Sequence, residues 1–299
     1  MTRSTRFLRL AFLAVVLLGT GRSQVCAQSQ TIFNFNGNLN VSTSVGTAAG
    51  LSFFNATTTT FNSTSAFGIG NLPGNPAGTR TVMNIPAFPD STTGFALAPN
   101  VGANGGSATK INQYTVGFDI YYPSASFAGN FAPLFQTNTN NTDDGDLFIR
   151  KNTPVTPEFG IGQTGYTGAS TVPFDQWVRI VAVYDLGNAT NAARYYANGS
   201  KLLTWNPGAS QLDARFAVEG TTGANRAFIL SDEDGETAVG YISSFYFSDT
   251  SLSDAQIAGF GVASAGGFQP VPEPMTILAI STTGLGLIGL VRRLQNKAK

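Results

Sequence analysis

The sequence predicts an all-β fold, an antiparallel β-sandwich, on three observations. Short apolar or alternating segments recur along the chain, each bounded by residues that favour turns. The chain holds 34 Gly and 14 Pro with only 11% charged residues, a composition unlike that of a helical bundle. The strand-like segments show no βαβ rhythm. Of the 299 residues, roughly 240 lie between two distinctive ends, which fits one all-β domain.

The central segments carry the clearest strand patterns. Over residues 115–122, apolar side chains at even positions alternate with the others, which predicts a half-buried strand. Residues 177–184 form an apolar, β-branched run broken only at Arg179, which predicts a more buried strand. Asn198-Gly199 favours the positive φ angles of a type I′ turn and therefore predicts a hairpin between 194–197 and 200–203.

The remaining elements are shorter. Ser251 to Gly259 has a capping serine, an acid in the first turn and a glycine at its end, which predicts one short helix. Further strands are expected at 31–35, 94–97, 146–149, 227–230 and 241–247.

The N-terminal segment has the features of a secretory signal peptide. Three arginines precede an apolar run from Leu10 to Leu18, and small residues follow, which predicts cleavage after Ala27. The alternatives are an uncleaved membrane anchor and a lipoprotein at Cys26, although the run is short for a span and the preceding residues do not resemble a lipobox. Cleavage after Ala27 removes the sole cysteine, so no disulfide is expected.

The C-terminal segment combines a short motif, an apolar stretch and basic residues. Pro272-Glu273-Pro274 precedes an apolar stretch at 275–291, long enough at ~1.5 Å per residue to span ~25 Å as a helix. Arg292 and Arg293 follow it, which predicts a cytoplasmic C-terminus and places residues 28–270 on the far side of the membrane.

This tail resembles the PEP-CTERM sorting signal of Gram-negative bacteria that make exopolysaccharide. Pro272, Glu273, Pro274, Arg292 and Arg293 match its motif positions. The resemblance implies an exosortase as partner, transient anchoring in the inner membrane, and a final location at the cell surface or outside the cell. The alternative is a permanent tail anchor. The expected organisation is a signal peptide at 1–27, a domain at 28–264, a linker at 265–270 and a sorting signal at 271–299, with its motif at 271–274, helix at 275–291 and basic tail at 292–299.

The order of the middle segments resembles a laminin-G-like, concanavalin A-like jelly roll. The matching segments are Phe35 to Leu39, a Trp-started strand ending at Tyr184-Asp185, the Asn198-Gly199 hairpin, and a closing strand that runs into Leu252-Ser253-Asp254-Ala255-Gln256-Ile257. Where members of that family often have His after the Trp, this chain has Val178-Arg179. The resemblance implies a jelly-roll sandwich. The concanavalin-like fold hosts glucanases, and laminin-G-like domains often bind calcium at a rim of the sandwich.

Composition restricts the chemistry. The chain has no His, which removes the serine triad, the commonest general base and His-ligated metal sites, so we expect no enzyme. Glu233 and Glu236 are three residues apart and would lie on opposite faces of a strand, unlike a glucanase carboxylate pair. Between the two ends the chain holds 9 basic and 17 acidic residues, about −8 in net charge, which argues against nucleic-acid binding.

Two groups of residues are candidates for ligand contact. Asp143, Asp144 and Asp146 lie in an Asn- and Asp-rich turn that could supply oxygen ligands to a calcium cofactor, although turn propensity also explains them. Tyr121, Tyr122, Tyr195 and Tyr196 could form a sugar-stacking face, although shielding of a sheet also explains them.

The sequence therefore favours an exported, exosortase-sorted, non-catalytic surface protein that binds extracellular polysaccharide. Two alternatives stay open: a polysaccharide-cleaving enzyme that uses carboxylates, and a structural matrix protein without a ligand.

Overall fold

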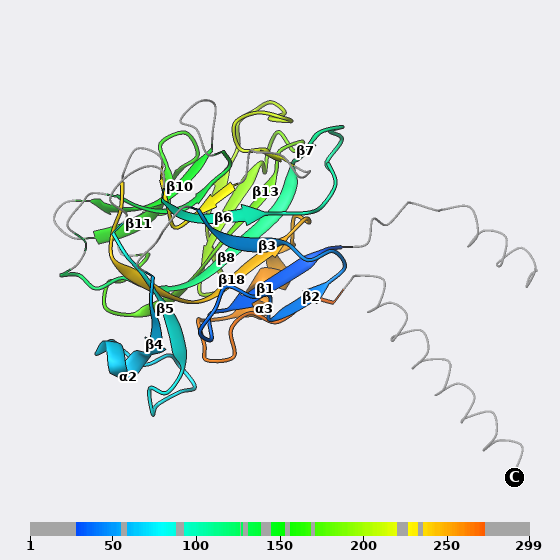
Figure 1. Ribbon diagram of the computed structural model, residues 1–299. Coiled ribbons are helices and arrows are strands. Elements are labelled where there is room, and N and C mark those ends of the chain that lie inside the picture. Colours follow the sequence, from blue (N-terminus) through cyan, green and yellow to red (C-terminus); the bar gives the residue numbers. More distant parts are fainter. Residues whose placement is uncertain are drawn as a thin grey trace, which may run out of the picture.

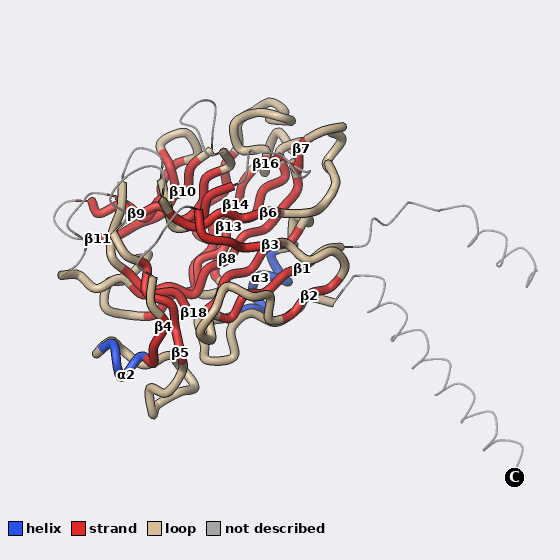
Figure 2. The backbone as a smooth tube through the Cα atoms, in the orientation of Figure 1, coloured by secondary structure: helices blue, strands red, loops and turns tan. Residues whose placement is uncertain are grey.

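The computed structural model describes residues 28–54, 59–87, 93–125, 127, 131–138, 145–152, 156–168, 171–219, 227–232 and 236–272. Every strand pair within these residues is antiparallel, and most strands belong to two large sheets (Figure 1). Figure 2 shows that strands and loops make up nearly all of the described chain. The predicted antiparallel all-β fold is confirmed at this level.

The first large sheet has nine strands among the described residues. Seven follow the order β15-β14-β13-β8-β18-β1-β2. On the edge of β18 that β1 occupies further along, β5 pairs with residues 240–242, and β4 pairs with β5. Their bounds are β1 Gln30–Asn34, β2 Thr43–Val45, β4 Phe61–Ser63, β5 Thr81–Ile85, β8 Gln113–Tyr121, β13 Trp177–Asp185, β14 Ala193–Ala197, β15 Ser200–Trp205 and β18 Gly240–Ser248.

The second large sheet has seven strands among the described residues, in the order β12-β11-β10-β9-β17-β6-β3. Their bounds are β3 Gly50–Phe54, β6 Gly94–Ala98, β9 Phe131–Gln136, β10 Asp146–Asn152, β11 Thr156–Ile161, β12 Gly165–Tyr166 and β17 Ala227–Ile229. A small third sheet pairs β7 (Lys110–Ile111) with β16 (Val218–Glu219).

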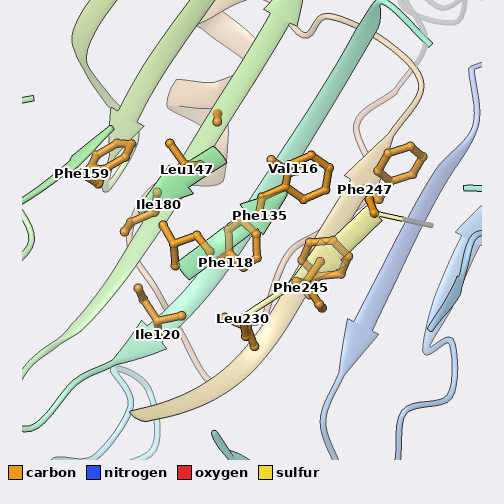
Figure 3. Close-up of a cluster of buried hydrophobic side chains, with 14 of the residues drawn as sticks. Val116, Phe118, Ile120, Phe135, Leu147, Phe159, Ile180, Leu230, Phe245 and Phe247 are labelled. Carbon is orange, nitrogen blue, oxygen red and sulfur yellow. The ribbon is translucent and has the colours of Figure 1, made fainter. Parts of the chain in front are cut away.

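The main hydrophobic core lies between the inner faces of the two large sheets. Phe118 of β8 and Phe245 of β18 have ring centroids 5.1 Å apart, and Figure 3 shows them in one cluster with Phe135 and Leu147, which belong to the opposite sheet. Each of these four side chains is at most 1% exposed. Full burial of a side chain of this size contributes about 1.5–3 kcal/mol to stability, so the alternating pattern of β8 specifies its register.

The outer face of the nine-stranded sheet is also covered. Helix α3 (Asp254–Phe260) and the chain after it pack over a second apolar cluster that includes Val181, Tyr246 and Phe268. The prediction that residues 115–122 form a half-buried strand is therefore wrong: the strand exists as β8, but both of its faces are buried. Asp119, on its outer face, is fully buried.

The predicted hairpin and helix are both present. Asn198 and Gly199 have φ angles of 49° and 78°, as a type I′ turn requires, and they join β14 to β15. Helix α3 begins after Ser253, whose side chain accepts a hydrogen bond from Gln256 N while Gln256 caps Ser253 in return. The predicted start at Ser251 is thus three residues before the first helical residue, Asp254. A short helix, α2 (Thr64–Phe67), was not predicted.

The expected linker at 265–270 is wrong. Ala265 N donates to Pro73 O over 3.0 Å, and Phe268 is 1% exposed. Gly266, Gln269 and Pro270 are exposed, but Ala265, Phe268 and the buried Val271 are held against the rest of the fold, so the folded domain continues past residue 264.

Candidate functional site

The four tyrosines expected to stack on sugars are buried. Tyr121, Tyr122, Tyr195 and Tyr196 are 6%, 3%, 0% and 1% exposed. Tyr195 Oη lies 2.8 Å from Thr164 Oγ1 inside the sandwich, and the Tyr121 ring packs 5.5 Å from that of Trp177. The prediction of an exposed stacking face is therefore wrong for these residues, because both faces of their sheet are covered.

The candidate calcium ligands are described only in part. Asp143 and Asp144 lie outside the described residues, while Asp146 Oδ2 is 3.3 Å from Arg215 Nη2. Gln136 Nε2 donates to Asp232 Oδ1 over 2.5 Å and to Asp146 Oδ1 over 3.4 Å, and Gln136 Oε1 is buried without a partner.

The described part of this cluster does not fit calcium. It offers two carboxylates and one amide oxygen, whereas calcium takes six to eight oxygen ligands, and a cation would compete with Arg215 for Asp146. Nowhere in the described chain do three or more His, Cys, Asp or Glu side chains gather as a metal site would need.

The processing residues fall mostly outside the described chain. Ala27, Glu273, Pro274, Arg292 and Arg293 are not described, and neither is the predicted helix at 275–291. Pro272 is the last described residue and is exposed. Among the helices that the structure describes, none is long and apolar enough to span a bilayer.

A polar cleft lies where β8, β13 and β14 meet the loop that leads to α3. Its volume is about 590 Å³. The lining residues are nearly all polar or charged: Gln113, Asp185, Asn188, Asn191, Arg194, Lys201, Thr250, Ser251, Ser253 and Asp254. A second cleft of about 580 Å³ shares Gln113 and Thr250 with the first. We call the two together the polar groove.

Asp254 organises the first cleft. Its carboxylate oxygens lie 2.6 Å from Arg194 Nη1, 2.6 Å from Lys201 Nζ and 2.7 Å from Tyr196 Oη. Hydrogen bonds from Lys201, Tyr196 and Arg194 hold the pKa of Asp254 well below its usual range. The first turn of α3 favours an acid at this position as well, so the carboxylate is fixed and ionised.

The second cleft contains a carboxyl whose pKa is shifted in the opposite direction. Asp249 Oδ1 accepts hydrogen bonds from Ser29 N over 2.7 Å and from Thr250 Oγ1 over 3.3 Å. Burial raises the pKa of Asp249 in spite of these bonds. Asn104 Nδ2 ties the wall together by donating to the carbonyls of Gln113 and Asp249, each over 2.8 Å.

The groove presents both donors and acceptors at fixed positions. Arginine and lysine donate, carboxylates accept, and amides and hydroxyls do both. None of the residues that line the two clefts is aromatic. Chemically, the groove suits a ligand rich in hydroxyl groups, held by hydrogen bonds rather than by stacking on a ring.

The sequence did not reveal this groove because its residues come together from distant segments. The capping pattern marked Asp254, and the Asn-Gly turn marked the hairpin that carries Lys201, but 53 positions separate these two residues. Only the pairing of β14 with β15 and the docking of α3 place them in contact.

No protein-family model matches the sequence, and no curated protein sequence matches it either. Solved structures do resemble the chain. Domain 4 of AbnA, a GH43 extracellular arabinanase from Geobacillus stearothermophilus solved with arabinotriose, is 16% identical with a TM-score of 0.45, covering 78% of this chain and 98% of that domain.

Two other similar structures come from larger proteins. The binding domain of botulinum neurotoxin serotype G is 13% identical with a TM-score of 0.44, covering 77% of this chain and 49% of that chain. A Trypanosoma rangeli sialidase mutant with trans-sialidase activity is 13% identical with a TM-score of 0.42, and the match covers 76% of this chain and 32% of the sialidase chain. The matched part is thus about half of the neurotoxin chain and a third of the sialidase chain. With TM-scores below 0.5, these likenesses say nothing about what this chain binds.

Proposed function

We propose that this protein is an exported, exosortase-sorted component of the cell surface or extracellular matrix, and that its non-catalytic, laminin-G-like jelly-roll domain binds exopolysaccharide. The observation that carries the binding part is the polar groove, two clefts joined at Gln113 and Thr250. The sorting part is carried by the Pro272-Glu273-Pro274 motif, the apolar stretch at 275–291 and Arg292-Arg293.

The position of the domain in the chain supports export. Gln28 and Ser29, the residues that follow the expected signal cleavage, are already buried, and Ser29 N donates to Asp249. Burial of the residues directly after Ala27 agrees with a mature chain that keeps them. The closing strand β18 followed by α3 agrees with the laminin-G-like order of elements.

The groove supports a polyhydroxylated ligand. Its ionic groups largely neutralise one another, because the first cleft holds two cations, Arg194 and Lys201, and two acids, Asp185 and Asp254. A neutral glycan can exchange hydrogen bonds with such fixed groups, and the absence of an aromatic platform favours modest affinity per sugar, which repetition along a polysaccharide would raise.

The test is binding of the processed native protein to the host's purified exopolysaccharide, followed by titration calorimetry. The groove variants are Asn191→Ala and Lys201→Met. Both residues line the first cleft; Asn191 is exposed there, and Lys201 donates a hydrogen bond to Asp254. The matched controls outside the groove are Asn62→Ala and Lys151→Met. We expect at least about tenfold weaker binding for the double groove variant and no change for the double control. Equal binding by all forms would overturn the groove assignment.

A second candidate, a matrix protein without a ligand, is favoured by one observation. Among the described residues, Phe53 is the one aromatic side chain in the set of large exposed hydrophobic residues, at 45% exposure. This candidate predicts that the wild-type protein binds no glycan, including the host's own polysaccharide, in the same assay.

A further inference from the structure

The chain between α3 and the Pro-Glu-Pro motif is a fixed part of the fold. We call residues 261–271 the strap. After α3 it crosses the outer face of the nine-stranded sheet, where Ala265 N donates to Pro73 O, Gly267 N donates to Ser264 O, and Ser264 donates a backbone hydrogen bond to buried Asp119. The strap therefore contacts both the loop between α2 and β5 and the centre of the sheet.

The end of the strap is held by one side chain. Gln30 Nε2 donates to Val271 O over 2.7 Å, and Val271 N donates to Gln30 Oε1 over 2.7 Å. Tyr246 Oη donates to the same Gln30 oxygen over 3.0 Å. We call these three hydrogen bonds among Gln30, Val271 and Tyr246 the clasp. Gln30 is 1% exposed and Tyr246 is 0% exposed, so the clasp lies in the interior. The Gln30 amide pairs with Val271 as a neighbouring strand would.

An aromatic anchor fixes the middle of the strap. The Phe268 ring lies 5.4 Å from that of Tyr246 and 5.1 Å from that of Phe260, and the Arg179 guanidinium lies 4.2 Å above it. Phe268 fills the space over Gly117, where a Cβ would come within 2.6 Å of Phe268 Cζ. The strap cannot slide along the sheet without emptying this site.

Proteolysis requires an accessible, extended segment of several residues, so a docked segment is cut only when it opens. Side-chain exposure alone does not protect the strap, because Val262, Gln269 and Pro270 are exposed, as is Pro272. What distinguishes the strap is that its backbone is anchored: Phe268 is 1% exposed, and Val271 is 9% exposed and hydrogen-bonded at both backbone groups.

We propose that the clasp sets the N-terminal limit of processing: while Gln30 holds Val271, cleavage falls C-terminal to Pro272, and the strap becomes a substrate only when the clasp opens. This inference rests on the proposed sorting of the protein. Its consequence is that the mature protein keeps the whole strap and presents its new C-terminus beside the first strand, β1.

The experiment is intact-mass analysis of the protein released by the native host, with full-length wild type, Gln30→Ala and Tyr246→Phe compared. We expect a wild-type C-terminus at or beyond Pro272, and additional C-termini within 261–271 in both variants, more in Gln30→Ala because it removes both bonds to Val271. Tyr114→Phe is the matched control, since it removes one buried hydrogen bond, to Phe216 O, far from the strap. It should match wild type. A wild-type C-terminus within the strap, or variants identical to wild type, would overturn the proposal.

A parallel measurement separates this proposal from the sorting assignment. The unprocessed full-length protein in detergent is treated with proteinase K, and cleavage within 261–271 is timed. We expect Gln30→Ala to be cut there about tenfold faster than wild type or Tyr114→Phe. If the host never removes residues 275–291, the sorting proposal fails while this rate ratio still tests the clasp. A ratio near one overturns the clasp even if sorting is confirmed.

Discussion

Arg179 and Asp119 form a buried, two-pronged ion pair across β13 and β8. Arg179 Nε lies 2.7 Å from Asp119 Oδ1, Arg179 Nη2 lies 2.6 Å from Oδ2, and the two side chains are 3% and 0% exposed. The remaining guanidinium nitrogen donates to Phe260 O at the end of α3. One charged pair thus joins the sheet to the helix and to the strap.

Breaking this pair should be strongly destabilising. Asp119→Asn leaves a guanidinium buried without its counter-charge, so we expect a loss of about 3–5 kcal/mol in the free energy of unfolding, measured by urea denaturation. Lys201→Met is the comparison, because Lys201 pairs with Asp254 and both side chains are largely exposed, at 42% and 51%. We expect that variant to lose about 1 kcal/mol or less. Equal losses in the two variants would contradict the buried character of the Arg179–Asp119 pair.

The double variant Asp119→Leu with Arg179→Met should recover part of the loss, since two charges are removed together. Recovery stays incomplete because Phe260 O then lacks its donor and Phe268 loses the guanidinium above its ring. The measurement is a double-mutant cycle, and additive losses from the two single variants would show that the side chains are not coupled.

The buried tyrosines predict unfolding at alkaline pH. Burial raises the pKa of Tyr195 to about 12 and the pKa values of Tyr114 and Tyr184 well above 10. A raised phenol pKa means that the unfolded chain loses its proton first, so stability falls as pH rises above about 10. We expect the phenolate absorbance of most tyrosines to appear together with the loss of circular dichroism. A gradual phenolate signal from a still-folded protein would contradict their burial.

The sequence predicted the elements whose signals are local. The alternation around Phe118, the apolar run that follows Trp177 and the Asn198-Gly199 turn each specify their own strand or turn, and all three are found in place. Strands such as β2 and β12 could not be predicted, because they are two or three residues long and too short to show an alternation of apolar and polar side chains. Their hydrogen bonds come from pairing with β1 and β11, which no local pattern records.

The candidate site could be predicted much less well. An alternating strand leaves open what covers its second face. The expectation of an exposed surface at Tyr121 and Tyr196 fails because α3, the strap and the chain from α2 to β5 cover that face. In the sequence, a charged residue within an apolar run, Arg179, is the feature that indicates a buried partner on the outer face of this sheet. The polar groove depends on the docking of α3, a tertiary event, and the strap looked like a linker because Gly266-Gly267 interrupts any regular pattern.

The β14–β15 turn should depend on glycine at position 199. Gly199 has a φ angle of 78°, and a Cβ there would lie 3.2 Å from Ala258 O in α3. We expect Gly199→Ala to lose about 1–2 kcal/mol in the free energy of unfolding, because a side chain is disfavoured in this conformation and also crowds the helix. Gly208→Ala is the control: Gly208 has a similar φ of 75° with nothing near its Cβ position, so it should show the backbone cost alone. A smaller loss for Gly199→Ala than for Gly208→Ala would contradict the contact with α3.

The Asp254 network should give a pH dependence of defined sign. Because the folded-state pKa of Asp254 lies below that of an unfolded aspartate, near 3.9, its stabilisation is complete above about pH 5. It is lost as pH falls through the lowered folded-state pKa. Its side chain is 51% exposed, so solvent screening limits the effect to about 0.5–1 kcal/mol.

We therefore expect Asp254→Asn to be less stable than wild type at pH 7, and the difference in the free energy of unfolding to shrink steadily below pH 4. Lys201→Met should cost stability in wild type but little in the Asp254→Asn background, as its partner is then uncharged. The measurement is the urea midpoint of the four forms at several pH values, and a difference that stays constant from pH 7 to pH 2 would show that Asp254 is not ionically held.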